Sequence, residues 1–96
     1  MKSLNEVLLT LEKNKGRLFF TYPIKSMAIF GSFARNEEDD TSDVDILVEF
    51  HDKIGVRFVD LANELENLFE LKVDLVSKNG IKKRYLEAIE EDLIYV

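Results

Sequence analysis

Three aspartates stand where their carboxylates could act together. Asp43 and Asp45 are separated by one residue at the start of an apolar run, and Asp74 lies inside a second such run. Because successive side chains of a β-strand point to opposite faces, Asp43 and Asp45 share one face, roughly 7 Å apart. Asp74 shares that face if the two strands are neighbours. Aspartate is disfavoured in strands, so an aspartate in the middle of one indicates a chemical role.

The ligand chemistry of these residues favours a hard divalent cation. Carboxylates gathered on one face repel each other unless a cation lies among them, and we expect such groups to have raised pKa values without it. The chain has no cysteine and a single histidine, His51, so only oxygen ligands are available, which suit Mg²⁺ or Mn²⁺. Two bridging aspartates and a third to one side are typical of two-metal sites, with ions about 3.5–4 Å apart. We therefore interpret Asp43, Asp45 and Asp74 as metal ligands.

A glycine-serine pair precedes the first two aspartates. Gly31 and Ser32 follow the short apolar segment at 26–30, and glycine there lets backbone N–H groups approach phosphate oxygens. Arg35 could reach a phosphate or hold the loop through a salt bridge. Alone, a Gly-Ser pair usually marks a turn and Asp-x-Asp is often solvated acid. Their combination with a third aspartate on the expected strand face favours the functional interpretation.

Length and charge narrow the function further. With 96 residues, the chain predicts one domain, 1–96, that buries a single modest core. Its net charge of −6 argues against general nucleic-acid binding, so phosphates would require a divalent metal. We see no apolar run long enough to cross a bilayer and no signal peptide, and we expect a cytoplasmic protein.

The hydrophobic pattern predicts a small α/β domain. Ser3 and Glu6 form a capping box at the start of an opening helix that we expect to be interrupted at 14–16. The pattern then predicts, in order, a strand at 26–30, a helical turn at 32–35, a loop at 36–42, a strand at 43–50, a helix at 58–69, a strand at 72–77 and a helix at 81–91. We expect a two-layer fold, with a three-stranded mixed sheet and helices packed on one face.

The spacing of these motifs resembles that of a known superfamily. Gly31-Ser32, ten residues, and then Asp43-Val44-Asp45 match the Gly-Ser-x10-Asp-x-Asp motif of the DNA polymerase beta-like nucleotidyltransferases. The stretches GSFARNEEDDTSDVDILVEF and LKVDLVS resemble in particular the minimal nucleotidyltransferases, or MNT proteins, over nearly the whole chain. One departure is Asn36, where relatives often have glycine, but asparagine tolerates a left-handed backbone.

The resemblance implies a role for each matching residue. Asp43 and Asp45 would bind two Mg²⁺ ions, and Asp74 would bind the catalytic one and help to activate the acceptor hydroxyl. Gly31 and Ser32 would hold the β- and γ-phosphates of ATP. Arg35 would support either the nucleotide or the loop. The implied reaction transfers AMP from ATP with release of pyrophosphate.

The acceptor implied by the resemblance is a partner protein. Larger relatives grip their acceptor with a second domain, for which this chain leaves no residues. MNT proteins are commonly paired with HEPN-domain ribonuclease toxins, and the MNT antitoxin adds AMP to a toxin tyrosine in type VII-like toxin–antitoxin pairs. An acidic chain would suit a ribonuclease with a basic surface.

Two alternatives remain open from the sequence. One is a non-catalytic antitoxin that only masks the toxin. The other is a homodimeric nucleotidyltransferase that modifies a small molecule, as aminoglycoside-modifying enzymes do.

Overall fold

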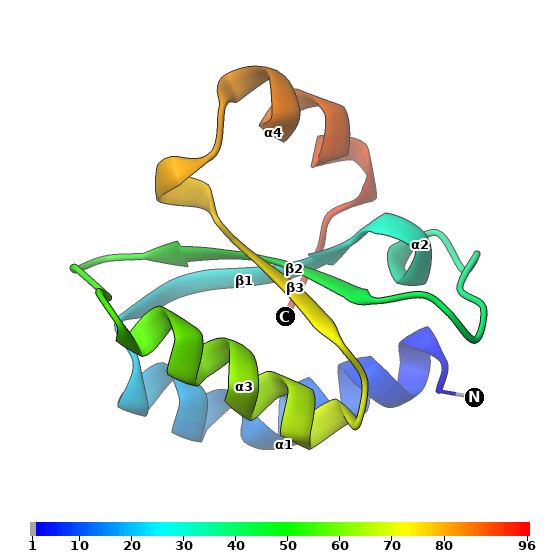
Figure 1. The fold of residues 1–96 in the computed structure, drawn as a ribbon, viewed down its shortest axis with the longest axis horizontal. Coiled ribbons are helices and arrows are strands. Elements are labelled where there is room, and N and C mark those ends of the chain that lie inside the picture. Colours follow the sequence, from blue (N-terminus) through cyan, green and yellow to red (C-terminus); the bar gives the residue numbers. More distant parts are fainter. Residues whose placement is uncertain (1) are drawn as a thin grey trace.

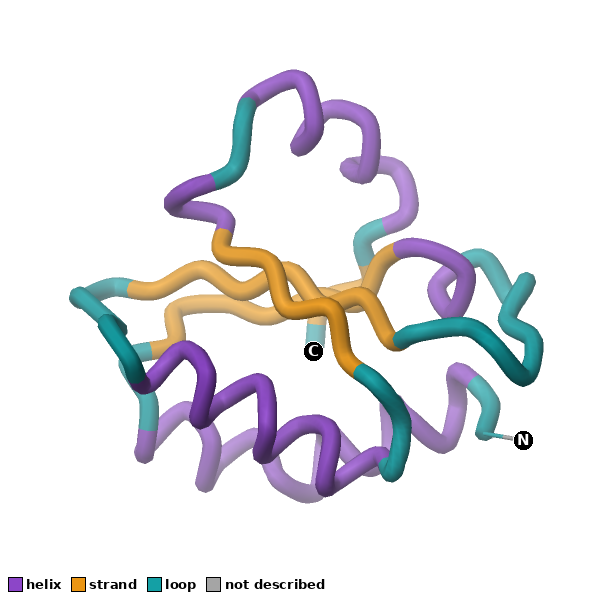
Figure 2. Tube along the Cα trace, viewed as in Figure 1, coloured by secondary structure: helices purple, strands orange, loops and turns teal. Residues whose placement is uncertain are grey.

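A mixed β-sheet separates two helices from a third. The computed structural model describes residues 2–96, whose elements are α1 (Leu4–Thr21), β1 (Ile24–Phe30), α2 (Gly31–Ala34), β2 (Val44–Phe50), α3 (Arg57–Phe69), β3 (Val73–Ser77), η1 (Lys78–Gly80), α4 (Lys83–Ile89), η2 (Glu90–Asp92) and β4 (Ile94–Tyr95). The predicted strands and the predicted middle helix begin and end within two residues of these bounds. Figure 2 shows the same elements as a tube coloured by type.

The strand order of the sheet is β3-β2-β1-β4. β1 is antiparallel to both β2 and β4, whereas β2 and β3 are parallel and are connected through α3. Residues 2–96 therefore form the predicted α/β fold with a mixed sheet, but with four strands, so the predicted number of three was wrong. The extra strand, β4, pairs with Ala28 and Ile29 over two residues only, which is too short to show an alternating pattern.

The main core lies between the sheet and the helices α1 and α3, which run side by side beneath it in Figure 1. Val44, Ile46 and Val48 of β2 face this layer and are fully buried, as their alternation predicted. The two helices cover them with buried residues at helical spacing: Val7, Leu11, Leu18, Leu61, Leu65 and Phe69.

Helix α4 lies on the opposite side of the sheet from α1 and α3 (Figure 1). The expectation that the helices pack on one face was therefore wrong for α4. None of the residues of α4 is fully buried, although Leu86 and Ile89 are half-buried, so this helix packs less closely than α1 and α3. It reaches the sheet through Tyr85, whose ring contacts Phe30 edge to face at a centroid distance of 6.5 Å.

Helix α1 is continuous through residues 14–16, where we expected an interruption. The capping box is confirmed, since the Glu6 N–H donates to Ser3 Oγ at 3.3 Å. Leu11 and Leu18, on either side of Gly16, are both buried in the core, so packing on both sides holds the glycine in helical geometry. Beyond it, Arg17 forms an ion pair with Glu64 of α3. Tertiary contacts thus outweigh the poor helix propensity of glycine.

None of the helices within residues 2–96 has the length and apolar character required to span a membrane.

Replacing Gly16 by alanine tests the continuity of α1. Apart from the adjoining residues and nearby backbone of α1 itself, no heavy atom lies within 4 Å of the Cβ that alanine would add. Because glycine is the less stable residue inside a helix, Gly16→Ala should raise the free energy of unfolding by about 0.5–1 kcal/mol in urea denaturation. Gly55→Ala is the matched control, since its Cβ also meets open space but its φ is +58°, and it should destabilise the protein. A destabilising Gly16→Ala would contradict a continuous helix.

Candidate active site

The parallel pairing of β2 and β3 brings Asp45 and Asp74 together. The two residues are direct partners in the register, and Asp45 is also the partner of Phe30 on β1. Paired residues of neighbouring strands point to the same face, so the three side chains form a row across the sheet. This face is opposite the main core. Asp45 is half-buried within the row, whereas Asp74 is exposed on the edge strand.

Gly31 lies directly against the carboxylate of Asp45. A Cβ at position 31 would collide with Asp45 Oδ2, and Gly31 has a φ of +75°, which side-chain-bearing residues rarely adopt. Both observations require glycine at this position. The Gly-Ser turn and the aspartate strand are therefore in contact.

The surroundings of Asp45 raise its pKa from the ordinary value of 3.8 to about 6. Burial is the largest cause, followed by the negative charges of Asp74 and Asp43, and a hydrogen bond with Asp74 adds to the effect. The positive charge of Arg35 acts in the opposite direction. The predicted rise through mutual repulsion is thus confirmed for Asp45, with burial as the larger contribution.

Asp43 stands at the edge of this group. β2 begins at Val44, one residue later than predicted, and Asp43 is exposed just before it. Its charge acts on Asp45, but within residues 2–96 no three aspartate, glutamate, histidine or cysteine side chains are close enough to hold a metal ion. The structure therefore joins Asp45 to Asp74 and leaves Asp43 nearby. A metal site made by all three remains a prediction.

The turn that contains Ser32 is fixed by backbone hydrogen bonds. The Arg35 N–H donates to the Gly31 carbonyl at 3.1 Å, and the Glu37 N–H donates to the Ser32 carbonyl at 2.8 Å. The first N–H groups of a helix have no acceptor within that helix, so those at the start of α2 are available to an anion. Asn36 has a φ of 57°, which confirms that asparagine here takes the left-handed conformation.

Arg35 makes two ion pairs. Its Nε donates to Glu37 Oε1 at 2.7 Å and its Nη1 donates to Asp92 Oδ2 at 2.9 Å. Arg35 was predicted either to reach a phosphate or to hold the loop through a salt bridge, and the structure shows the salt bridge. Asp92 was not foreseen, because it is 57 residues away in the sequence and belongs to a run of acidic residues with no distinguishing pattern.

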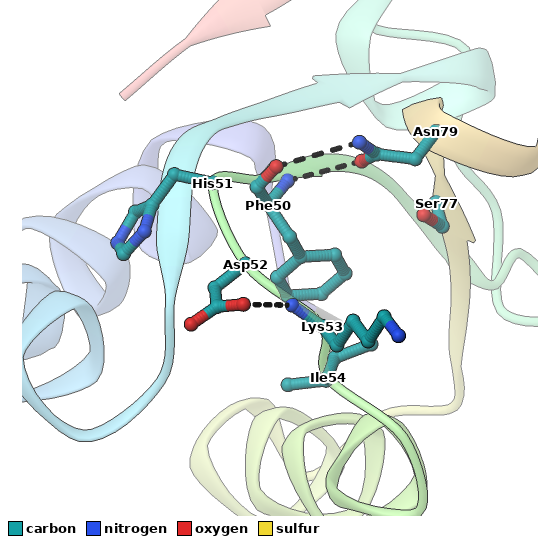
Figure 3. Close-up of a pocket in the computed structure, with 7 residues that line it drawn as sticks. All are labelled: Phe50, His51, Asp52, Lys53, Ile54, Ser77 and Asn79. Carbon is teal, nitrogen blue, oxygen red and sulfur yellow. Dashed lines mark hydrogen bonds between the residues drawn. The ribbon is translucent and has the colours of Figure 1, made fainter.

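A pocket of about 380 Å³ lies at the opposite end of β2. It is lined by Phe50, His51, Asp52, Lys53, Ile54, Ser77 and Asn79. Figure 3 shows the Asn79 side chain beside the Phe50 backbone, where its Oδ1 accepts from the Phe50 N–H at 3.1 Å and its Nδ2 donates to the Phe50 carbonyl. The side-chain amide of Asn79 thus satisfies the backbone N–H and carbonyl groups of Phe50, the last residue of β2. None of the predicted site residues lines this pocket.

Asp45→Asn should make stability less dependent on pH. Because the pKa of Asp45 is raised in the folded protein, the folded state binds more protons, and stability is lost as the pH rises from about 4 through about 6. Without divalent metal, Asp45→Asn should stabilise the protein by about 1 kcal/mol at pH 7, a value reduced by solvent screening, and have little effect at pH 4. Urea denaturation in a chelating buffer measures this effect. An equal change at both pH values, or a similar profile for Asp40→Asn in the exposed loop, would contradict it.

Gly31→Ala should be more harmful than Gly55→Ala. Both substitutions place alanine at a positive φ, but only the alanine at position 31 collides with the Asp45 carboxylate. We expect Gly31→Ala to lower the free energy of unfolding by about 1–3 kcal/mol more than Gly55→Ala, since the strand or turn must shift. Comparison of their denaturation midpoints tests this, and equal losses would show that the contact imposes no constraint.

Comparison with known proteins identifies the family and the fold of the chain. Residues 11–96 match the family model of the nucleotidyltransferase domain. The chain is 48% identical to MJ0126 of Methanocaldococcus jannaschii, over the full length of both chains, and the name of that relative gives protein adenylyltransferase as an inferred activity.

Two solved structures show the same fold. A structure described as an inferred minimal nucleotidyltransferase superimposes with a TM-score of 0.83 and 29% identity, over 97% of this chain and 95% of that one. A second, described as tri-AMPylated Shewanella oneidensis HEPN toxin in complex with MNT antitoxin, gives a TM-score of 0.70 at 21% identity, over 93% of this chain and 70% of that one, which shows the fold alone. The chain therefore belongs to the nucleotidyltransferase domain family and has the fold of its minimal members.

Proposed function

We propose that this protein is a Mg²⁺-dependent protein adenylyltransferase that transfers AMP from ATP to a tyrosine hydroxyl of a HEPN ribonuclease toxin, and so acts as its antitoxin. The observation that carries the proposal is the register of β2 and β3, which sets Asp45 beside Asp74 and against Gly31. The names of the relatives support the reaction, since MJ0126 is named for adenylyl transfer to protein and the Shewanella complex contains an AMPylated toxin.

The donor chemistry of the site fits divalent magnesium. Asp43, Asp45 and Asp74 offer oxygen donors of like charge, and their repulsion contributes to the raised pKa of Asp45, which a bound cation would relieve. Asp45 and Asp74, which are partners in the register, would hold Mg²⁺, and Asp43 would have to move closer to join them. When bound, the metal supplies positive charge for the triphosphate and for the pyrophosphate that leaves, which a chain of net charge −6 otherwise lacks.

The proposed reaction is a displacement at the α-phosphorus of ATP. The tyrosine oxygen forms the new bond to the α-phosphorus, while the bond from that phosphorus to the oxygen bridging to the β-phosphate breaks, and pyrophosphate leaves. The hydroxyl proton passes to the carboxylate of Asp74, which is exposed to an approaching acceptor. Gly31 and Ser32 orient the β- and γ-phosphates through backbone N–H groups and the serine hydroxyl.

A macromolecular acceptor is consistent with the position of Asp74. β3 is an edge strand of the sheet, and Asp74 is exposed on it, so a side chain of another protein can approach without entering a deep cleft. The acidic character of the chain favours association with a ribonuclease whose RNA-binding surface is basic.

Aspartate-to-asparagine variants test the proposal. The purified chain is incubated with a cognate HEPN toxin, Mg²⁺ and ATP labelled at the α-phosphate, and label on the toxin is quantified and located by mass spectrometry. We expect label on a tyrosine, and a loss of about 100-fold or more with Asp45→Asn or Asp74→Asn. Asp40→Asn, which removes the same charge from the nearby exposed loop, should retain wild-type transfer.

Two results would overturn the proposal in favour of its alternatives. Neutralisation of the toxin by Asp45→Asn with no label transferred would indicate an antitoxin that acts by binding alone. Transfer of AMP to a small polyol by the isolated chain, with an unlabelled toxin, would indicate a small-molecule nucleotidyltransferase.

A further inference from the structure

A charged bridge connects the C-terminal part of the chain to the Gly31–Ser32 turn. Arg35, directly after α2, donates to Asp92 of η2 at 2.9 Å and to Glu37 at 2.7 Å, through different nitrogens of one guanidinium. A guanidinium that bonds two carboxylates in this way is held in orientation as well as in position. Arg35 therefore joins three segments: α2, the loop after it and the turn before β4.

Asp92 lies just before a segment that is hydrogen-bonded to β1. Two residues after it, Ile94 of β4 pairs with Ile29 of β1, and the Val96 N–H donates to the Met27 carbonyl at 3.0 Å. β1 is the strand that leads directly into Gly31. Asp92 and the Gly31–Ser32 turn are thus both anchored to the same strand, and the Arg35 side chain closes the connection between them.

The bridge acts on the turn through two backbone hydrogen bonds. The two residues that it holds, Arg35 and Glu37, donate their own N–H groups to the carbonyls of Gly31 and Ser32. Any displacement of Arg35 or Glu37 is therefore passed to the peptide groups that would meet the phosphates. Exposed ion pairs usually contribute little to stability, so the main effect of this bridge is on the geometry of the turn.

We propose that Asp92 is a positioning residue for the nucleotide: through Arg35 and Glu37 it holds the Gly31–Ser32 turn in the conformation that receives the triphosphate. This inference rests on the proposed function, because it assumes that the turn binds the phosphates of ATP. Asp92 itself contacts no reacting group.

The test compares Asp92→Ala with Asp92→Glu, which keeps the carboxylate, and with Glu91→Ala, which removes a neighbouring exposed acid. Adenylyl transfer to the toxin should show a KM for ATP about tenfold higher in Asp92→Ala, with kcat within about twofold. Asp92→Glu should recover most of the affinity, and Glu91→Ala should match the wild type. Calorimetric titration with a non-hydrolysable ATP analogue and Mg²⁺ should show the same order without catalysis.

Amide hydrogen exchange supplies a readout that does not need nucleotide. In the free protein, Asp92→Ala should speed exchange of the Arg35 and Glu37 N–H groups, while the core amides of β2 keep wild-type protection. An Asp92→Ala variant with unchanged exchange, KM and analogue affinity would overturn the positioning role. Loss of protection throughout β2 would also overturn it, because it would show a general structural effect.

Failure of the proposed function is distinguishable from failure of this inference. A wild-type chain that neither binds the analogue nor transfers AMP would overturn both. A wild-type chain that does both, with an equally competent Asp92→Ala variant, would overturn only the role of Asp92.

Discussion

The parallel pairing of β2 with β3 is the constraint on which the site depends. The pairs Val44–Val73 and Ile46–Leu75 place apolar side chains on the core face, and Asp45–Asp74 lies between them in the register. A slip of one residue would turn Asp74 into the core and Leu75 out to solvent. Burial of the apolar residues therefore fixes the direction in which the acids point, so the core itself specifies the arrangement of the site.

This arrangement destabilises the charged form of Asp45. Its carboxylate is half-buried beside a like charge and directly against Gly31. Stability and function conflict at such a site, because the groups that would hold a cation destabilise the protein that lacks one. The rest of the molecule offsets this with ordinary packing, and the polar contacts of Arg17 and Tyr22 with Glu64 tie α1 to α3 far from the acids.

The features that could be predicted from sequence are those with a short-range physical signature. The alternation of apolar and polar residues correctly placed Val44, Ile46 and Val48 in the core and Asp45 on the opposite face. Only one assignment of residues to the two faces buries the apolar side chains. Helical periodicity located α3 in the same way. The motif spacing indicated that the Gly-Ser turn and the aspartates belong to one site, whereas the direct contact between Gly31 and Asp45 is visible only in the structure.

The features that were missed depend on contacts distant in sequence. The continuity of α1 across Gly16 is decided by burial of Leu11 and Leu18 against the sheet, which outweighs local propensity. β4 has two residues, and its pairing with β1 is visible only in three dimensions. The ion pair between Arg35 and Asp92 joins charged surface side chains, and a hydrophobic pattern does not predict where such side chains lie. The side of the sheet on which α4 lies was also missed, because it depends on contacts between residues far apart in sequence, such as Tyr85 with Phe30.

The position of α4 outside the main core divides the molecule into two parts of unequal resistance to unfolding. Few apolar side chains hold α4, and its aromatic contact with Phe30 is a single one. Segments with so little burial open at lower free energy than the strands beneath them. The helix can therefore detach and return while the sheet, α1 and α3 remain folded. Substitutions in α4 should accordingly cost little of the stability of the scaffold that carries the three aspartates.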